Sequence, residues 1–438
     1  MPLEVPRSLE CNGHLAPLPA TRAPTRRAHS PSLSAMPLEP APPPPWRVAV
    51  IGGGRMGQNY CRLFASTPLA ELAALVEPNA ERAAAVCAEF GIAAHHRDVP
   101  SMLAACRPQI VAVVTPGQFF RDAVLACAAS PGMLAVQCEK PFGGPLADAD
   151  AMVAACAERG VFFAGGALTR ALPELQTLAR RLEAGEFGSI TSVSMHGWSS
   201  EILGGGCQQL SVLTLLTNAE VVSVSAWSDH PLEGLRDSAG HMLDANDGSK
   251  AAPKPGVGPS DAQQDEPEHE DSVHYQAMLT LSSGLSCPTF GTGAPPASPH
   301  GAALPGARLA PRQGGVEVFT SDNYLIRWRW GVPEVLRLVA TDGPIAELRP
   351  VEVALDSDDG LAGQGHHAGA VFSMLQALRS GDERDMYSTG AHVRHTLEVA
   401  TAAARSALQG GAPVALPLEA RDDTAAALFP RPYRWGKL

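Results

Sequence analysis

A glycine turn between a buried strand and a helix is the first feature of this chain that predicts chemistry. Residues 47–51, Arg-Val-Ala-Val-Ile, are mostly small or β-branched, as in a central parallel strand. Gly52, Gly54 and Gly57 follow with the G-x-G-x-x-G spacing, and residues 58–66 suit a helix. Such a turn offers backbone amides at a helix N-terminus to a pyrophosphate. The bare motif is weak, but the strand and helix beside it predict a dinucleotide site.

An acidic residue, Glu77, closes the next strand, 25 positions after Gly52. A carboxylate here can accept hydrogen bonds from the adenosine ribose hydroxyls and repel a 2′-phosphate, which favours NAD over NADP. The plainer alternative is a surface carboxylate at a strand end. Arg82, just over one helical turn further on, keeps NADP open.

Two more strands end in residues that suit hydride transfer. One ends in Thr115-Pro116, where Thr115 can donate to a cofactor hydroxyl, although Thr-Pro also ends strands for structural reasons alone. The other is followed by Glu139-Lys140-Pro141. The Lys140 ammonium can stabilise a developing alkoxide, or shuttle a proton if burial lowers its pKa. A solvated cation is the alternative interpretation of Lys140.

The composition is that of a globular protein with an acidic balance. The chain has 438 residues, 45% of them apolar and 18% charged, with a formal net charge of −12. This charge argues against nucleic acid or an anionic membrane as the main partner. The nine cysteines are odd in number and lack a C-x-x-C spacing, so we expect reduced thiols in a cytoplasmic protein.

Strand and helix patterns alternate from residue 46 to residue 166, which predicts an α/β domain with a doubly wound parallel sheet, a Rossmann domain. The expected strands are Val48–Ile51, Leu72–Val76, Ile92–His95, Ile110–Val114, Leu134–Cys138 and Val161–Ala164. The expected helices between them include Asn79–Phe90, Gln118–Ser130 and Ala147–Arg159.

Residues 167–438 change to alternating strands and predict a second, α+β domain with a mainly antiparallel sheet. Its expected strands are Ser189–His196, Val221–Trp227, His274–Leu281, Val316–Phe319 and Leu348–Ala354, and its last helices are Ala368–Leu378 and Val393–Leu408. Two segments near 232–270 and 288–315 are poor in large apolar residues, and we expect disordered insertions there.

The first 45 residues contain Pro, Ser and Arg without apolar periodicity and predict a disordered leader. Their arginines allow an organelle transit peptide as an alternative, but Glu4, Glu10 and Glu39 weaken it because such peptides are poor in acids.

In their order along the chain, these motifs resemble those of the Gfo/Idh/MocA oxidoreductases, which include glucose–fructose oxidoreductases and inositol dehydrogenases. The matching stretches are Gly52–Gly57, Glu77-Pro78, Thr115-Pro116, Glu139–Pro141, Thr169–Pro173 and a C-terminal pattern over 396–414. The resemblance implies an NAD(P)-dependent oxidoreductase that acts on a sugar, cyclitol or related polyol, with Lys140 as the catalytic residue. It also implies a cis Lys140–Pro141 peptide, and a homodimer or homotetramer formed through the free face of the second sheet.

The same resemblance gives a set of expected site residues. NAD, with NADP possible, would contact Gly52, Gly54, Arg55, Met56, Gly57, Glu77, Thr115, Pro116 and Glu139, and the substrate would contact Arg170 and Gln208. No metal is expected, because no carboxylate or cysteine clearly completes a set with His366-His367 or with His392 and His395.

One departure from the family leaves two functions open. Where members carry Gly-x-His-x-x-Asp, this chain has Gly206-Cys207-Gln208-Gln209-Leu210-Ser211. Gln208 and Ser211 therefore replace an acid/base pair, and a glutamine cannot exchange a proton near neutral pH. The first hypothesis is an active oxidoreductase; the alternative is a member that binds NAD(P) without turnover, as a sensor or partner subunit.

Overall fold

The computed structural model describes residues 43–142, 145–196, 205–228, 275–290, 315–329, 333–341, 346–355 and 366–419. The expected leader lies outside these residues except for 43–45. Both expected insertions also lie outside them, apart from the ends of the second: residues 288–290 and 315 belong to strands.

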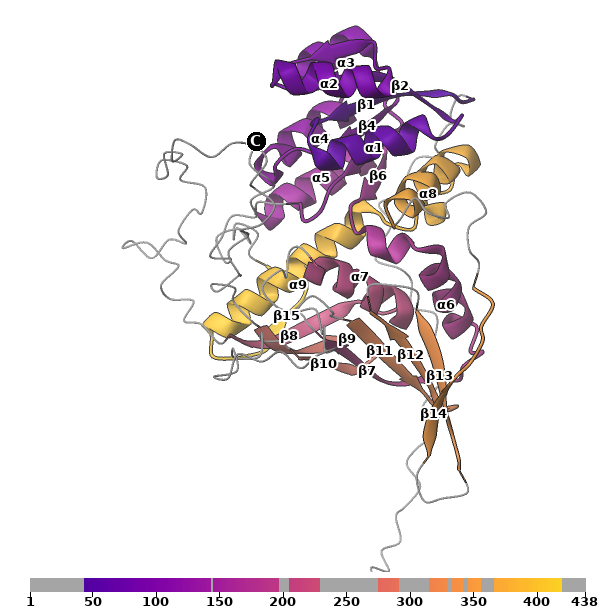
Figure 1. The fold of residues 1–438 in the computed structure, drawn as a ribbon. Helices are drawn as coiled ribbons and strands as arrows, with labels where there is room; N and C mark the ends of the chain where they lie inside the picture. The colour runs from indigo at the N-terminus through magenta and orange to yellow at the C-terminus, as the bar shows by residue number, and fades with distance from the viewer. Residues whose placement is uncertain are drawn as a thin grey trace, which may run out of the picture.

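A parallel six-stranded sheet forms the core of the N-terminal part, with strand order β3-β2-β1-β4-β5-β6 (Figure 1). The order reverses between β1 and β4, and ligands bind at the carboxyl edge of such a point. The strands are β1 (Trp46–Ile51), β2 (Ala70–Val76), β3 (Ala94–His96), β4 (Ile110–Val113), β5 (Ala135–Cys138) and β6 (Phe162–Gly165). The predicted doubly wound parallel sheet is confirmed.

Helices cover both faces of this sheet, and one of them comes from the C-terminal part of the chain. The local helices are α1 (Arg55–Ala65), α2 (Ala80–Phe90), α3 (Val99–Cys106), α4 (Phe120–Ala128) and α5 (Leu146–Glu158), with a 3₁₀ turn η1 (Gly117–Phe119). The distant helix, α8 (His366–Ser380), packs against α1, β5 and β6. Its Val371, Met374 and Leu375 are fully buried in one cluster with Trp46 and Val48. Each such side chain contributes about 1.5–3 kcal/mol of burial free energy.

The second sheet has nine described strands in the order β14-β13-β12-β11-β7-β10-β9-β8-β15. Its pairings are antiparallel except for that of β10 with β7. The strands are β7 (Ile190–His196), β8 (Val221–Ser228), β9 (Tyr275–Leu281), β10 (Ser286–Phe290), β11 (Gly315–Thr320), β12 (Tyr324–Trp328), β13 (Glu334–Val339), β14 (Glu347–Pro350) and β15 (Val414–Ala415). The predicted mainly antiparallel second sheet is confirmed.

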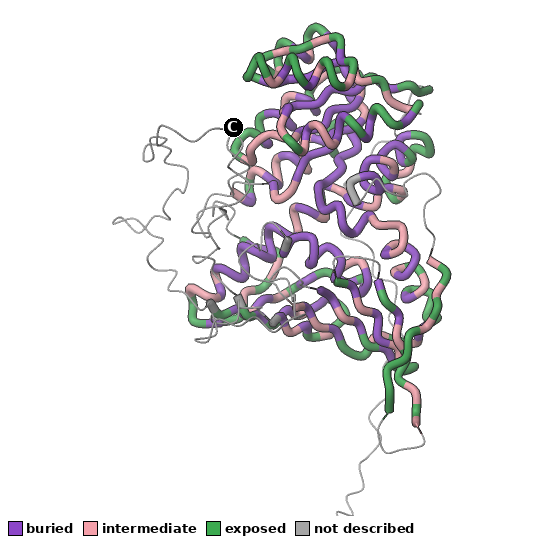
Figure 2. Tube along the Cα trace, viewed as in Figure 1, coloured by how far each residue is buried: buried purple, intermediate pink, exposed green. Residues whose placement is uncertain are grey.

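One face of the second sheet is covered by helices, and α9 runs between the two sheets (Figure 1). The elements on this side are the 3₁₀ turn η2 (Leu168–Ala171), α6 (Pro173–Glu183), α7 (Gly205–Thr217) and α9 (Gly390–Leu408); a 3₁₀ turn η4 (Glu383–Asp385) joins α8 to α9. In Figure 2 the interior between the sheets is mostly buried, whereas the hairpin of β13 and β14 is mostly exposed.

Two sequence predictions in the second domain need correction. The strand expected over Leu348–Ala354 is Glu347–Pro350 instead, because pairing with β13 ends at Pro350. The segment from 288 continues β10, because Thr289 pairs with Ala277 of β9. The pairing of β10 with β7 involves only Thr289 and Phe290, so the missing N–H of Pro288 interrupts no bond to β7. Among the described residues, no helix is both long and apolar enough to cross a membrane.

Candidate active site

The glycine turn lies at the point where the strand order reverses. Gly52 has φ +108°, and an added Cβ would lie 2.7 Å from the carbonyl oxygen of Val114, which follows β4. A Cβ on Gly57 would lie 1.8 Å from the carbonyl oxygen of Gly52, so only glycine lets α1 pack on the turn. A Cβ on Gly54, by contrast, would meet nothing within 4 Å. The turn is therefore tight behind Gly52 and open in front of Gly54.

The N-terminus of α1 faces the open space in front of Gly54, and no capping side chain binds its first N–H groups. Gly54 is the N-cap and provides no side-chain hydrogen bond, and the first turn contains no acidic residue. Arg55 is exposed and Met56 half-buried at the first two helical positions. Helix N-termini carry a partial positive charge and free N–H groups, so this end suits a phosphate.

Glu77 holds the glycine turn through its side chain. The Gly53 N–H donates to Oε2 and the Asn79 N–H donates to Oε1, both over 2.9 Å. Arg82 Nη1 lies 3.6 Å from Oε2. The carboxylate is thus placed beside the turn, as the sequence predicted, but it also fixes the turn's backbone. Its contact with a ribose stays a prediction.

Thr115, two residues after β4, has an unsatisfied hydroxyl. Its Oγ1 is buried and has no hydrogen-bond partner, while Gly52 packs directly against the preceding carbonyl. A buried hydroxyl without a partner is uncommon and marks a place where a ligand or water completes the bonding. Together with the open space at Gly54, it fits a dinucleotide lying along this edge.

Glu139 and Lys140 follow β5 at the same edge. Glu139 is 3% exposed and accepts a hydrogen bond from the Tyr60 hydroxyl of α1 over 2.7 Å. Burial raises the pKa of Glu139, and the charge of Lys140 acts in the opposite direction. The Lys140–Pro141 peptide is cis, as the resemblance implies.

Lys140 lies between the end of β5 and the start of α7. An added Cβ on Gly166 would lie 2.3 Å from the Lys140 backbone nitrogen, so glycine lets the segment after β6 run against Lys140. Burial raises the pKa of the Cys207 thiol to about 11, and the Lys140 charge acts in the opposite direction. That electrostatic coupling places the Lys140 ammonium near the first turn of α7.

Gln208 does not point a free amide into the crevice. Its Oε1 accepts from the Thr169 N–H over 3.0 Å, and its Nε2 donates to the Gly166 carbonyl over 3.1 Å. The Ser211 hydroxyl donates to the Gln208 carbonyl within α7. Both replacements of the expected acid/base pair therefore make internal bonds. Gln208 ties α7 to the segment after β6, and its contact with a substrate stays a prediction.

Arg170 is a buried cation in η2. It is 7% exposed, its Nε has no hydrogen-bond partner, and no described carboxylate forms an ion pair with it. Burial lowers the pKa of Arg170 to about 9. An arginine stays charged at neutral pH, so this side chain needs a polar ligand or water.

The two histidines in the helical pair of α9 have local partners. His392 completes the cap of α9 with Thr389, and His395 Nε2 accepts from the Val221 N–H over 3.2 Å. Burial lowers the pKa of both rings. In the part of the chain that is described, no group of three side chains could hold a metal ion.

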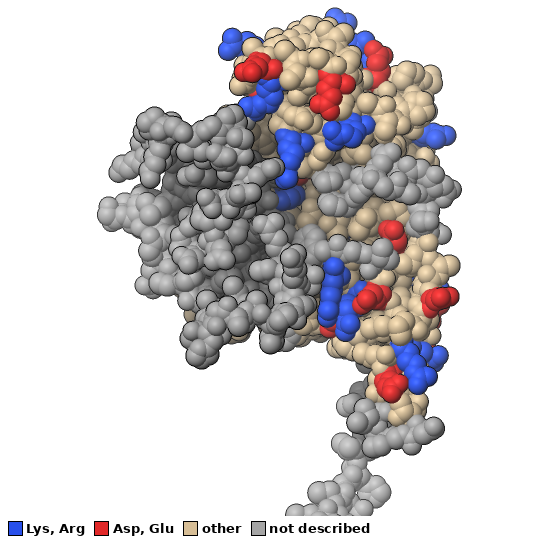
Figure 3. Space-filling model, in the orientation of Figure 1, with Lys and Arg blue, Asp and Glu red and all other residues tan. Residues whose placement is uncertain are grey.

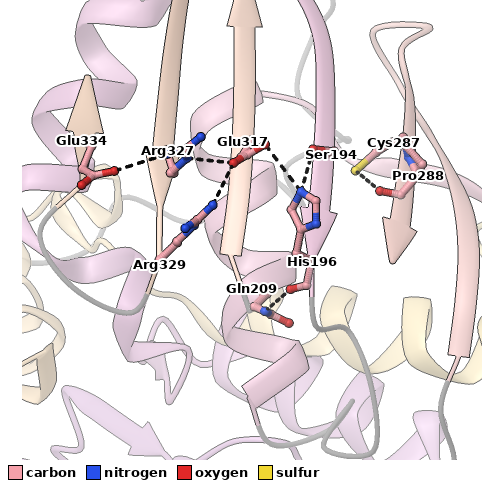
Figure 4. Close-up of polar contacts among 9 residues, drawn as sticks. All are labelled: Ser194, His196, Gln209, Cys287, Pro288, Glu317, Arg327, Arg329 and Glu334. Carbon is pink, nitrogen blue, oxygen red and sulfur yellow. Dashed lines mark hydrogen bonds and ion pairs between the residues drawn. The ribbon is translucent and has the colours of Figure 1, made fainter. Parts of the chain in front are cut away.

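His196 lies on the open face of the second sheet (Figure 4). Its Nε2 lies 3.5 Å from Glu317 Oε2, and Arg327 also binds Glu317. The helix side of β11 carries Val316 and Val318, which are fully buried, so Glu317 faces away from α7. His196 is therefore directed away from Lys140.

One residue near Lys140, Tyr60, was not predicted from the sequence. Tyr60 supports Glu139, and the only available signal was its position three residues after Gly57 in α1. Lys140 itself carried a stronger signal than the one used: the chain has four lysines among 33 basic residues, and Lys140 is the one in the described part. Arginine supplies positive charge elsewhere, so a lysine here indicates a need for a compact, titratable cation.

Comparison with known proteins identifies the N-terminal part. A family profile described as "Oxidoreductase family, NAD-binding Rossmann fold" (GFO_IDH_MocA) matches residues 46–166. Residues 46–166 belong to the Gfo/Idh/MocA oxidoreductase family. This bears out the predicted NAD-type cofactor at the level of the family.

Curated relatives of this chain are similar to it over part of their length. It is 36% identical over 141 residues to the D-apiose dehydrogenase of Paraburkholderia graminis, covering 32% of this chain and 37% of that protein. It is 31% identical over 213 residues to the UDP-N-acetylglucosamine 3-dehydrogenase of Acidithiobacillus ferrooxidans, covering 47% and 65%. The chain thus matches less than two thirds of either relative.

Solved structures extend the likeness to the whole fold. An oxidoreductase from Agrobacterium radiobacter, crystallised with NAD⁺, L-tartaric acid and magnesium, superposes with a TM-score of 0.60. The superposition covers 84% of this chain and 98% of that one at 18% identity. At this identity the likeness concerns the fold, and it includes the second sheet as well as the first.

Proposed function

We propose that this chain is an NAD-dependent oxidoreductase that moves a hydride to or from a CH–OH carbon of a sugar, cyclitol or related polyol. The observation that carries the proposal is the convergence of three strand ends. The glycine turn after β1, Thr115 after β4 and Lys140 after β5 lie at one edge of the sheet, at the point where ligands bind in such folds.

The residues of this edge fit NAD. The phosphates would approach Gly54 and the amides of Arg55 and Met56, where the backbone is open. Thr115 would use its unsatisfied hydroxyl on the cofactor, and Pro116 and Glu139 would line the same edge. Glu77, held between Gly53 and Asn79, would accept from a ribose hydroxyl with the lone pairs left over.

Lys140 is proposed as the catalytic residue. A bound nicotinamide would supply or accept the hydride. The Lys140 ammonium would donate to the substrate oxygen and stabilise its negative charge as the alcohol becomes a carbonyl, or the reverse. Because the amide of Gln208 cannot exchange a proton, water or the neutral amine form of Lys140 would take the hydroxyl proton when the alcohol is oxidised, and the Lys140 ammonium would return it in the reverse direction.

The substrate class rests on the relatives. The two curated proteins described above are named dehydrogenases of D-apiose and of UDP-N-acetylglucosamine, which both contain a sugar. Since this chain matches only part of each, its own substrate is a proposal. Arg170 and Gln208 lie next to the Lys140 side of the crevice and remain the candidates for its contacts.

The open face of the second sheet is the proposed surface for a homodimer or homotetramer. Exposed large apolar side chains occur along it, namely Val222, Trp227, Met278 and Phe319. Glu317 with Arg327 and Arg329 forms an ion-pair cluster on the same face (Figure 4). On the side of the molecule shown in Figure 3, described acidic and basic residues are interspersed. Light scattering that gives the mass of one chain would contradict this surface.

The decisive experiment measures binding and turnover separately. We expect purified protein to bind NADH and to reduce NAD⁺ with at least one member of a sugar and polyol panel. Lys140→Ala should lower kcat by about 10³-fold or more, because it removes charge stabilisation of the reacting oxygen, yet keep the Kd for NADH. Lys140→Arg keeps the charge and should not restore kcat if Lys140 also moves the proton.

Other outcomes would change the proposal. Tight NADH binding with no turnover across the panel would favour a cofactor-binding protein without activity. An unchanged kcat in Lys140→Ala would exclude the catalytic role.

A further inference from the structure

The guanidinium of Arg170 is a buried positive charge that the described protein does not neutralise. No described carboxylate pairs with it, its Nε is sealed from solvent without a partner, and 7% of the residue remains exposed. A buried cation is normally paired, because removing a charge from water is costly. An arginine cannot escape this cost by losing its proton. An anion from outside the described residues would complete the site.

The groups around Arg170 do not supply that negative charge. His392, in the first turn of α9, has its pKa lowered well below its ordinary value by burial and by the Arg170 charge, so it is neutral at pH 7. Glu398, two turns along α9, already accepts from Arg394 and from the Leu418 N–H. The N-terminus of α9 itself carries a partial positive charge. The surroundings thus favour an anion beside Arg170.

The backbone that carries the Arg170 side chain is fixed on both sides. The preceding N–H, of Thr169, donates to Gln208, and the Arg170 carbonyl accepts from Gln176 Nε2 over 2.7 Å. Such fixation lowers the entropy that a ligand contact would otherwise cost.

Arg170 lies on the Lys140 side of the crevice. The segment that contains it starts at Gly166, against the Lys140 backbone, and Gln208 ties that segment to α7 at both Gly166 and Thr169. The first turn of α7 is also where the Lys140 charge acts on Cys207. The turn that suits the pyrophosphate belongs to α1 and β1 instead. An anion at Arg170 therefore belongs to the substrate.

We propose that Arg170 binds a carboxylate of the substrate, so that the substrate is a polyhydroxylated acid whose reacting carbon meets Lys140. This inference rests on the proposed oxidoreductase function. One guanidinium provides a single fixed positive charge, which matches a carboxylate monoanion better than a phosphate dianion. Its planar N–H groups also match the two oxygens of a carboxylate.

The test compares sugar acids with neutral partners in which a CH2OH group replaces the carboxylate. The pairs are D-glucuronate and D-glucose, D-galacturonate and D-galactose, and D-gluconate and D-glucitol. Two readouts are used on the full chain: kcat/KM for NAD⁺ reduction, and calorimetric binding of each compound to NADH-loaded protein. The variants are Arg170→Gln and Arg170→Lys, with Arg159→Gln as a control at an exposed arginine after α5.

We expect at least one acid to be preferred over its neutral partner by about 100-fold in kcat/KM, and Arg170→Gln to reduce that ratio to about 1. Arg170→Lys keeps the charge without the planar pair of donors and should give an intermediate ratio. Arg159→Gln should leave the ratio unchanged. In Arg170→Gln, kcat/KM should fall much further for the acid than for its neutral partner.

Several results would overturn the carboxylate subsite. A higher kcat/KM for the neutral partner, or an equal kcat/KM for both members of every pair, would exclude the carboxylate subsite. This result needs the wild-type protein alone, so it can be obtained even if Arg170→Gln fails to fold. Equal loss for acid and neutral compounds in Arg170→Gln would indicate a structural role. Turnover of neutral compounds without acid binding rejects the subsite but keeps the oxidoreductase. Acid binding that depends on Arg170, without turnover of any compound, keeps the subsite but rejects the oxidoreductase function.

Discussion

On one side of the crevice, the turn from Gly52 to Gly57 and the carboxylate of Glu77 lie within a single β1-α1-β2 unit. On the other side, Lys140, Arg170 and Gln208 come from three segments that are far apart in the sequence. Hydrogen bonds join Gln208 to the segment of Arg170, and Gly166 packs against the Lys140 backbone. The first side is shaped by backbone and short-range contacts, and the second by tertiary contacts. Damage to the first should therefore affect mainly cofactor binding, and damage to the second should affect folding and turnover.

The largest effect is expected at Gln208. Gln208→Leu leaves the Thr169 N–H and the Gly166 carbonyl buried without partners, which should lower the free energy of unfolding by about 2–4 kcal/mol. Denaturant unfolding measures it. Ser211→Ala, which loses one bond within α7, is the matched control and should cost less than about 1 kcal/mol. A Gln208→Leu protein with unchanged stability would contradict the tertiary role and return Gln208 to the substrate contacts.

A pair of glycine substitutions separates packing from binding on the cofactor side. Gly57→Ala places a Cβ 1.8 Å from the Gly52 carbonyl oxygen and should cost about 1–3 kcal/mol of stability. Gly54→Ala meets nothing within 4 Å and should fold normally, yet weaken NADH binding because it occupies the space for the phosphates. Thermal unfolding and NADH titration of both variants give the answer. Normal NADH affinity in Gly54→Ala would place the phosphates elsewhere.

The smallest effect concerns the choice between NAD and NADP. Glu77→Gln removes the negative charge that Arg82 faces over 3.6 Å and releases Arg82 for a 2′-phosphate. The ratio of NADPH to NADH affinity should rise by about fivefold, as expected for a partly exposed ion pair. Fluorescence titration with both nucleotides measures it, and Glu81→Gln, an exposed acid in the first turn of α2, is the control. An unchanged ratio of NADPH to NADH affinity would mean that Glu77 stabilises the glycine turn and does not select the cofactor.

The sequence predicted the cofactor side well because its signals are local. The apolar run over Val48–Ile51, the glycine spacing and the acid at Glu77 all lie within about 30 residues, and together they predict the strand, the turn and the helix that the structure has there. The structure adds that Glu77 holds the turn itself, which no spacing reveals.

The substrate side was less predictable because its bonds connect distant segments. Residues 206–211 showed that Gln208 replaces a histidine, but only the structure shows its amide bound to Gly166 and Thr169. In the second sheet, β12 and β13 were missed, and the segment starting at Pro288 was interpreted as an insertion although its first residues continue β10. Proline and mixed polar residues weaken a local strand pattern, and pairing with neighbouring strands overrides it.

The packing of α8 against β5, β6 and α1 has a consequence for synthesis on the ribosome. The last strand of the parallel sheet ends at Gly165, but the helix that covers one of its faces begins about 200 residues later, at His366. At the usual elongation rate, α8 is synthesised roughly 10–40 s after the last strand of the sheet, so this face of the sheet stays uncovered for that time. Apolar side chains such as Phe162 and Trp46 are exposed to chaperones or aggregation in that interval. The parallel-sheet part precedes α8 in the chain, yet its core is completed only after α8 has been synthesised.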